Sequence, residues 1–263
     1  MFRTTGFVAD GIPACAGMTV ALLRPCRMEP TMADGIGVIF DVDGVLIDSY
    51  QSHFESWRLL ATEIGRSCTE AEFAQRFGRT SRETIVDQWP DRLWTDEEVR
   101  VLEDRKESLY RNIIQGQFPA MPGASNLIRQ LHAAGYQIAV GSSGPPENVN
   151  LVIDQLGVAE IIRCRITARH VTRGKPDPQV FQLAARALEV PFHRCCVVED
   201  APPGVQAAHA AGMVCVGFAS TGRTHVELQD AECIVDSLDE LTSPGISQLI
   251  HAGLRTRSPI NQE

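Results

Sequence analysis

The hydrophobic pattern of the chain is clearest where three consecutive apolar residues, Val38 to Phe40, lead directly into an acidic segment. Unbroken apolar β-formers are typical of a strand that is buried on both faces, as in a parallel sheet. Asp41 and Asp43 follow this run, and burying two carboxylates costs free energy unless a cation meets them. The pattern therefore predicts a central strand whose end faces solvent or a ligand, with Gly44 turning the chain away.

Between residue 49 and about Phe118 the periodicity predicts only helices. Asp48 or Ser49 caps the first of them, which ends at Gly65. The later helices are expected over 70–77, 81–89 and 95–115. This run without a strand predicts an inserted, all-helical cap domain, which we place at residues 49–118.

Strands and helices alternate over the rest of the chain. The strands are expected at 136–140, 161–166, 195–198, 213–218 and 233–235, and the helices over 124–134, 145–156, 179–188 and 202–211. Such alternation predicts an α/β fold with a doubly wound parallel sheet. We place this core at residues 34–48 and 119–252, followed by a tail at 253–263.

The composition fits one globular domain with a modest insertion, because the 263 residues are 44% hydrophobic and 22% charged. The net charge of −9 argues against broad nucleic-acid binding, which depends on basic surfaces. No apolar run approaches the length of a membrane-spanning helix. The eight cysteines contain no CxxC pair, so we expect reduced thiols and a cytoplasmic location rather than a zinc site or disulfides.

Residues 1–33 show no clean periodicity. Their apolar stretch, 20–23, is too short for a signal-peptide core, and the basic and apolar parts stand in the wrong order for a targeting segment. We expect a poorly ordered extension, or a translation start near Met32.

Polar groups follow several of the predicted strands. The groups are Asp41 with Asp43, Ser142, Lys175, and Glu199 with Asp200. Because loops at the same end of a parallel sheet converge, these side chains are expected to meet.

This set suits phosphoryl transfer through a carboxylate. Asp41 would attack phosphorus to form an aspartyl phosphate, and Asp43 would protonate the leaving oxygen and then take a proton from water. Asp200, with Glu199, would complete a Mg²⁺ site with Asp41 and the Asp43 carbonyl.

Two further groups would handle the phosphate. Ser142, with Ser143 and the backbone N–H groups after it, would bind phosphate oxygens. Lys175 would neutralise developing charge and keep Asp41 ionised. Each residue alone also has a structural explanation, since Ser142 could cap a helix, Lys175 could be a solvated loop charge, and Glu199–Asp200 could be an acidic helix N-terminus.

The four groups together resemble the haloacid dehalogenase (HAD) superfamily of phosphohydrolases, in the branch with a helical cap after the first strand (subfamily IA). The motifs that carry the resemblance are FDVDGVLIDS (40–49), IAVGSS (138–143), GKPDP (174–178) and VVEDAPPGVQAAHAAGM (197–213). They fall within about residues 36 to 240. The resemblance implies a Rossmann-like core, a cap that closes over the substrate, and dependence on Mg²⁺.

The cap is similar to that of the β-phosphoglucomutase group. There a histidine at the place of His53 helps couple cap closure to catalysis, an arginine at the place of Arg82 holds a distal phosphate, and a second basic residue matches Lys106. The alternatives are a surface or hinge histidine for His53 and a solvated helix face for Lys106.

The chain departs from the mutase pattern at two places. The mutase loop has one residue fewer than Gly78–Arg82, and this chain has Gly144 and Pro146 where the mutase carries a Ser and an Asn. We therefore favour a phosphatase acting on a small phosphate monoester of sugar-phosphate or phosphoglycolate type. A phosphosugar mutase is the alternative, and a non-catalytic binding protein on the same fold is a more remote one.

Three other classes fit less well. A true haloacid dehalogenase needs no second acid, and a phosphonoacetaldehyde hydrolase has a small residue at the place of Asp43. The sequence around Lys175 is no P-loop, because Pro176 follows the lysine. The expected partner is a small phosphorylated metabolite, with no nucleic acid and no membrane. We expect the protein to be a monomer.

Overall fold

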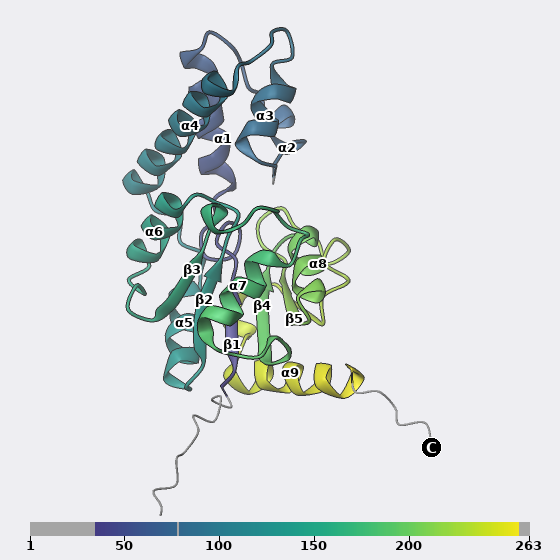
Figure 1. The fold of residues 1–263 in the computed structure, drawn as a ribbon. Helices are drawn as coiled ribbons and strands as arrows, with labels where there is room; N and C mark the ends of the chain where they lie inside the picture. Colours follow the sequence, from purple (N-terminus) through teal and green to yellow (C-terminus); the bar gives the residue numbers. More distant parts are fainter. Residues whose placement is uncertain (1–34, 78, 258–263) are drawn as a thin grey trace, which may run out of the picture. The chain divides into compact units, whose positions relative to one another are not determined.

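The structure, a computed structural model, describes residues 35–77 and 79–257 of the chain. Its centre is a parallel six-stranded sheet in the order β3-β2-β1-β4-β5-β6 (Figure 1). The strands are β1 (Gly37–Phe40), β2 (Gln137–Gly141), β3 (Ile162–Ile166), β4 (Cys195–Glu199), β5 (Val214–Phe218) and β6 (Cys233–Val235). β1 lies between β2 and β4, where the strand order reverses, and ligands bind at such a reversal in open α/β sheets.

Helices cover both faces of the sheet. One face carries α5 (Ala124–Ala133), α6 (Pro146–Gln155) and α9 (Ser243–Arg257), and the other carries α7 (Gln179–Leu188) and α8 (Pro202–Ala210). Successive strand residues point to opposite faces, so Val38 and Phe40 pack on the first side and Ile39 on the second. All three are fully buried, which explains why β1 is continuously apolar.

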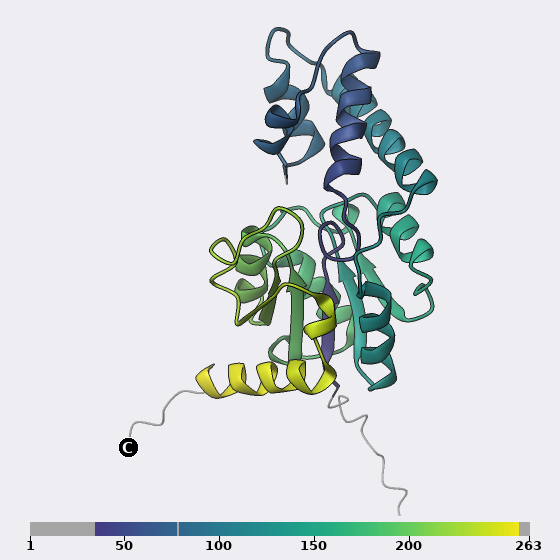
Figure 2. The same cartoon turned by 180° about the vertical axis from the view of Figure 1, so that it is seen from behind.

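Four helices follow β1 and form a helical segment (Figure 2). They are α1 (Tyr50–Glu63), α2 (Glu70–Ala74), α3 (Ser81–Gln88) and α4 (Asp96–Gly116). A separate hydrophobic cluster, which includes Trp57, Phe73 and Ile85, holds them together. Capping boxes begin three of the helices, because Thr69, Thr80 and Thr95 each exchange hydrogen bonds with a glutamate three residues later.

The two connections between the sheet and the helical segment run side by side. Ile47 forms an antiparallel bridge with Ala120, and the Asp48 N–H donates to the Pro119 carbonyl at 2.9 Å. The helical segment therefore leaves and rejoins the sheet at one place, close to the end of β1.

The predicted α/β fold with a doubly wound parallel sheet is confirmed. The helix predicted over 70–77 is too long, because α2 ends at Ala74. Beyond it the Arg76 N–H donates to the Phe73 carbonyl, three residues back, which is the hydrogen bond of a tight turn. The sequence pattern also missed α9, which runs to Arg257 although we placed a tail from residue 253. The expectation for residues 1–33 lies outside the described residues. In the part of the chain that is described, no helix is long and apolar enough to cross a membrane.

Candidate active site

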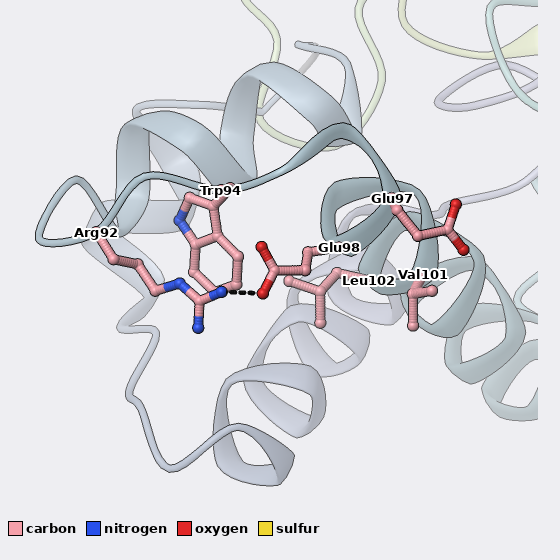
Figure 3. A pocket seen from close by; sticks show the side chains of 6 residues that line it. All are labelled: Arg92, Trp94, Glu97, Glu98, Val101 and Leu102. Atoms are coloured by element: carbon pink, nitrogen blue, oxygen red, sulfur yellow. Dashed lines mark hydrogen bonds and ion pairs between the residues drawn. The ribbon is translucent and has the colours of Figure 1, made fainter.

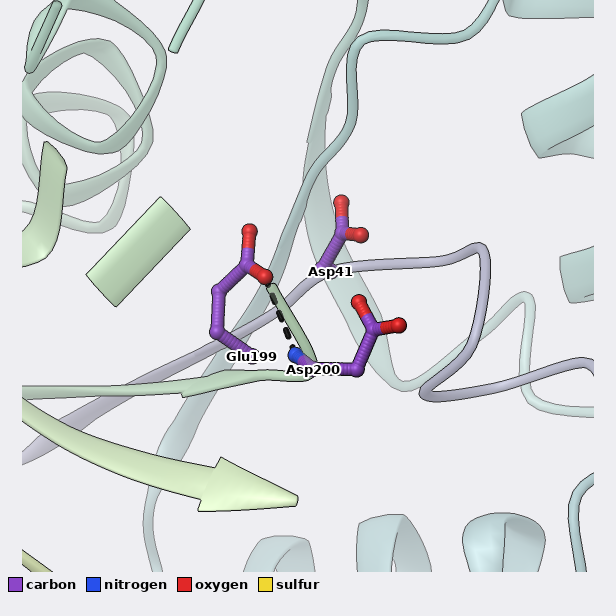
Figure 4. A group of neighbouring side chains, drawn as sticks. All are labelled: Asp41, Glu199 and Asp200. Atoms are coloured by element: carbon purple, nitrogen blue, oxygen red, sulfur yellow. Dashed lines mark hydrogen bonds between the residues drawn. The ribbon is translucent and has the colours of Figure 1, made fainter. Parts of the chain in front are cut away.

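Three carboxylates gather at the ends of β1 and β4 (Figure 4). Phe40 on β1 pairs with Val198 on β4, so the residues that follow them, Asp41 and Glu199, lie in one row across the sheet. Together with Asp200 they offer oxygen atoms within 4.8 Å of one another, and all three residues are buried. Strand register thus brings together side chains that are about 160 residues apart in sequence.

Lys175 lies between two of these carboxylates. Its Nζ is 2.8 Å from Asp41 Oδ1 and 2.5 Å from Glu199 Oε1, and its side chain is 11% exposed. The Phe181 ring lies 5.0 Å from the same nitrogen. Burial alone would lower the pKa of Lys175, but Asp41 and Glu199 raise it above its ordinary value, so the group is an ammonium ion. The interpretation of Lys175 as a solvated loop charge is wrong.

Glu199 is held on both of its oxygens. Oε1 accepts from Lys175, and Oε2 accepts from the backbone N–H groups of Asp200 at 3.0 Å and Ala201 at 3.1 Å. A Cβ atom at Gly204, on α8, would lie 1.9 Å from the Glu199 carboxyl carbon. Only a glycine therefore lets this carboxylate occupy its position.

Asp200 packs against the turn that follows β1. A Cβ at Gly44 would lie 2.3 Å from Asp200 Oδ2, and Gly44 has a φ of +77°, so both space and backbone conformation require glycine there. Burial and the neighbouring Glu199 raise the pKa of Asp200 to about 7, although Arg223, with Nε 3.5 Å from Oδ2, acts in the opposite direction.

With all of its carboxyl groups ionised, the cluster carries more negative than positive charge. Burial raises the pKa of Asp41 well above its ordinary value; Lys175 opposes this shift, while Glu199 and Asp200 add to it. Three carboxylates thus face one buried ammonium ion and the more distant, partly exposed Arg223. An oxygen-liganded divalent cation would offset this excess, so the donor set fits a hard metal ion.

Asp43 turns toward the helical segment rather than toward these carboxylates. His53 Nε2 lies 3.1 Å from Asp43 Oδ1, and the Tyr110 hydroxyl donates to the same oxygen at 3.3 Å. The rings of His53 and Tyr110 stack in parallel with centroids 4.0 Å apart. Burial alone would raise the pKa of Asp43, but hydrogen bonds, that from His53 above all, and the nearby Lys106 lower it to about 2.

Lys106 lies inside the helical segment, so the interpretation of a solvated helix face is wrong. Its side chain is 4% exposed, and Nζ lies 2.9 Å from His53 Nδ1 and 3.0 Å from Glu107 Oε1. His53, whose side chain is 14% exposed, stands between Asp43 and Lys106. The structure thus joins two of the three predicted cap residues to Asp43.

The loop after β2 places Ser142 beside Asp43. Ser142 is buried, and its Oγ accepts from the Gly144 N–H at 2.9 Å. A Cβ at Gly144 would lie 3.2 Å from that Oγ and 3.8 Å from Asp43 Oδ2. Ser142 is not the cap of α6, because Pro145 holds that position. Ser143 is exposed in the same loop, just before the N-terminus of α6.

Arg82 is not joined to this group by any contact recorded for the described residues. It lies on α3, where Nη1 is 2.8 Å from Asp96 Oδ1 and Nε is 4.0 Å from Glu103 Oε2. Its side chain is 49% exposed, so it could exchange these partners for an anionic ligand. Gly78, at the start of the same predicted loop, lies outside the described residues.

Two surface hollows among the described residues lie away from the carboxylates. A pocket of about 270 Å³ in the helical segment is lined by Arg92, Trp94, Glu97, Glu98, Val101 and Leu102 (Figure 3). Another, of about 290 Å³, includes Asp48 and Thr221 in its lining. Neither hollow is lined by a predicted catalytic residue. We therefore place the candidate active site at the cluster of carboxylates and Lys175.

Several polar residues near the site escaped the sequence analysis. They are Glu107, Tyr110, Arg111, Asn148 and Arg223. For α4 the helical spacing could have shown that Lys106 is buried. Lys106 stands seven residues after Val99 and four before Tyr110, on the face of the helix that the apolar residues bury. No comparable pattern marked Asn148 or Arg223.

The chain belongs to the haloacid dehalogenase-like hydrolases, because the model of that family matches residues 37–212. It is 29% identical to the chloroplastic 5-amino-6-(5-phospho-D-ribitylamino)uracil phosphatase of Arabidopsis thaliana over 91% of its own length, and it spans 64% of that protein. It is 30% identical to validoxylamine A 7'-phosphate phosphatase of Streptomyces hygroscopicus subsp. limoneus, over 79% of this chain and 96% of the relative.

A relative of another kind and a solved structure agree with this assignment. The chain is 30% identical to β-phosphoglucomutase of Bacillus subtilis (strain 168), over 68% of this chain and 81% of the relative. The crystal structure of a family IA, variant 3 HAD hydrolase from Entamoeba histolytica matches with a TM-score of 0.75 and 27% identity, over 82% of this chain and 99% of that one. The predicted family, and with it the prediction of a hydrolase, is confirmed.

We predict that Gly204→Ala destabilises the protein by about 1–3 kcal/mol, the usual cost of forcing an extra methyl group into a packed site. The new Cβ would displace Glu199 and break its bond with Lys175. Urea unfolding measures the change, and Gly116→Ala is the matched control because nothing lies within 4 Å of that position. Equal stability of the two variants would contradict the packing argument.

Proposed function

We propose that the protein is a Mg²⁺-dependent phosphatase that hydrolyses a small phosphate monoester through an aspartyl-phosphate intermediate. The observation that carries this proposal is the buried Asp41 carboxylate, oriented by Lys175 beside Glu199 and Asp200. A carboxylate fixed in this way is ready to attack phosphorus rather than to rotate among hydrogen-bond partners.

Asp41 and Asp200 would hold the metal ion together with the Asp43 carbonyl. Glu199 supports them, because its two oxygens are already engaged by Lys175 and by backbone N–H groups. A bound Mg²⁺ supplies charge neutralisation for the phosphoryl oxygens. Lys175, in contact with Asp41, opposes the rise in its pKa and so favours the ionised nucleophile.

The reaction divides into two displacements. In the first, an Asp41 oxygen forms a bond to phosphorus, the bond to the leaving oxygen breaks, and Asp43 gives that oxygen its proton. In the second, a water oxygen bonds phosphorus, the Asp41–phosphorus linkage breaks, and Asp43 takes the proton of the water. The hydrogen bond from His53 favours the ionised Asp43 that the second step needs. The first step needs protonated Asp43, so this hydrogen bond has to weaken when the substrate arrives.

Phosphate binding falls to the loop between β2 and α6. Ser142 and Ser143 lie in this loop shortly before α6, whose N-terminal dipole favours anions, although Pro145 and Pro146 at that end have no N–H to donate. Gly144 leaves room beside Asp43 because it has no side chain. We infer that the transferred phosphoryl group binds there, between Asp41 and the helix.

The helical segment α1–α4 acts in this proposal as the cap over the substrate. The substrate class that we favour is a sugar phosphate or a compound of the phosphoglycolate type. Two of the relatives are named as phosphatases of phosphorylated organic molecules, which supports hydrolysis. Gly144 and Pro146 also stand where the mutase carries a Ser and an Asn, so contacts to phosphate or sugar are lost there.

A phosphosugar mutase remains the second candidate. The contact of His53 with both Asp43 and Lys106 favours it, since the resemblance to the mutase group predicts this pair in the cap. The relative from Bacillus subtilis is named as such an enzyme. A non-catalytic protein is the weakest candidate, because Asp41 and Lys175 are both present and in contact.

Three further predictions concern the cellular location of the protein, its partner and its oligomeric state. Six cysteines in the described part of the chain are free thiols, which supports a reducing, cytoplasmic location. We keep a small phosphorylated metabolite as the partner and a monomer as the working state.

We predict that Asp41→Asn abolishes turnover of p-nitrophenyl phosphate, because an amide cannot act as the nucleophile. Circular dichroism and thermal unfolding check that the variant is folded. Asp154→Asn, an exposed carboxylate on α6, is the control and keeps full activity. Substantial Mg²⁺-dependent turnover by Asp41→Asn would exclude Asp41 as the nucleophile.

A phosphate-release screen separates the two enzyme candidates. We expect inorganic phosphate from a sugar phosphate or from phosphoglycolate. β-Glucose 1-phosphate is tested with and without a bisphosphate activator. If glucose 6-phosphate accumulates and phosphate is not released, the enzyme is a mutase.

A further inference from the structure

A buried polar bridge connects α4 of the helical segment to α6 of the α/β core. Glu107 on α4 accepts from Lys106 and from Ser81 on Oε1, both at 3.0 Å, and from Asn148 Nδ2 on Oε2 at 2.7 Å. Asn148, on α6, also accepts from Arg111 Nη1 at 2.9 Å. Asn148 is 6% exposed and the Glu107 side chain is 16% exposed. All of these contacts are therefore made largely out of water.

The bridge continues to the proposed general acid. The Lys106 ammonium can only donate, so His53 Nδ1 accepts from it and the ring proton resides on Nε2. That N–H donates to Asp43 Oδ1. An unbroken series of donors and acceptors thus runs from Asn148 through Glu107, Lys106 and His53 to Asp43.

Charges alternate along this series, which explains why it is tolerated in the interior. Asp43 and Glu107 are negative, Lys106 and Arg111 are positive, and the neutral groups stand between them. Burial alone would raise the pKa of Glu107, but Lys106 lowers it, so Glu107 is a carboxylate. Loss of any one member would leave a neighbouring buried polar group without its partner.

Each member fixes the position of the next. Lys106 has a flexible side chain that packs 5.6 Å from the Trp57 ring and 5.5 Å from the Tyr110 ring, and Glu107 fixes its nitrogen beside His53. Glu107 in turn is fixed by Asn148, which lies only six residues after Ser142. The helix that follows the phosphate loop is thereby coupled to the acid.

We propose that Glu107 and Asn148 are positioning residues for the general acid: they hold Lys106 so that His53 sets the orientation of the Asp43 carboxyl group. The inference rests on the proposed role of Asp43 as the acid. Both residues act through Lys106 and His53. Their effect is expected only where the leaving group has to be protonated, because that is the step that Asp43 serves.

The test compares two substrates that differ in leaving group. p-Nitrophenolate leaves readily without a proton, whereas the phenolate of phenyl phosphate is a poorer leaving group and depends more on the acid. We expect Asn148→Ala to lower kcat/KM for phenyl phosphate by on the order of tenfold, part of the 10²–10⁴ that a positioned acid supplies. With p-nitrophenyl phosphate the loss is expected to stay within about twofold.

Control variants separate this effect from simple damage to the fold. Asn150→Ala, which removes an exposed asparagine of the same helix bonded to Arg165 at 2.7 Å, is expected to leave both substrates unaffected. Glu107→Gln is expected to show the same selectivity as Asn148→Ala, and the double variant no more than either single one. Glu107→Gln also serves if Asn148→Ala fails to fold.

The outcomes distinguish the inference from the proposed function. Asp43→Asn removes the proposed acid completely, so it shows how much more kcat/KM falls for phenyl phosphate than for p-nitrophenyl phosphate when the acid is lost. If Asp43→Asn shows no preference between the substrates, the proposed role of Asp43 fails and the inference fails with it. If Asp43→Asn is selective but Asn148→Ala and Glu107→Gln slow both substrates equally, or neither, only the positioning role is overturned.

Discussion

The ammonium group of Lys175, held between Asp41 and Glu199, is the interaction on which the site depends. Buried carboxylates each cost several kcal/mol in lost hydration, so clustered ones require a cation among them. Lys175 meets that need on one side, and a divalent ion is suited to the other. The same electrostatic requirement that makes the cluster costly in free energy therefore suits it to a divalent cation.

The rest of the fold delivers these groups to one place. Parallel register places Asp41 and Glu199 side by side, and Gly44 and Gly204 remove the side chains that would otherwise overlap the carboxylates. The helical segment contributes a second polar system around Lys106, which ends on the proposed acid rather than on the nucleophile. The proposed nucleophile and the proposed acid are thus supported by different parts of the structure.

The sequence sufficed for the parts of the fold that repeat a simple rule. Buried strands read as apolar runs, and the acids after them marked the ends of β1 and β4. Helix α9 was missed because Pro244, Gly245 and Gly253 lower its helix propensity, whereas packing of its apolar residues on the sheet overrides that preference. Contacts between distant polar residues follow no sequence period, so the partners of Lys106 could not be predicted.

Calorimetric titration of Mg²⁺ into the wild-type protein and into Asp200→Asn measures the proposed metal site without relying on turnover. We expect one bound Mg²⁺ per chain. For Asp200→Asn we expect an affinity at least about tenfold lower, as is usual when a metal ligand or its supporting partner is lost. Asp154→Asn, which removes an exposed carboxylate, should bind as the wild type does. If the wild type binds no Mg²⁺, or if Asp200→Asn binds it with equal affinity, the proposed metal site is contradicted.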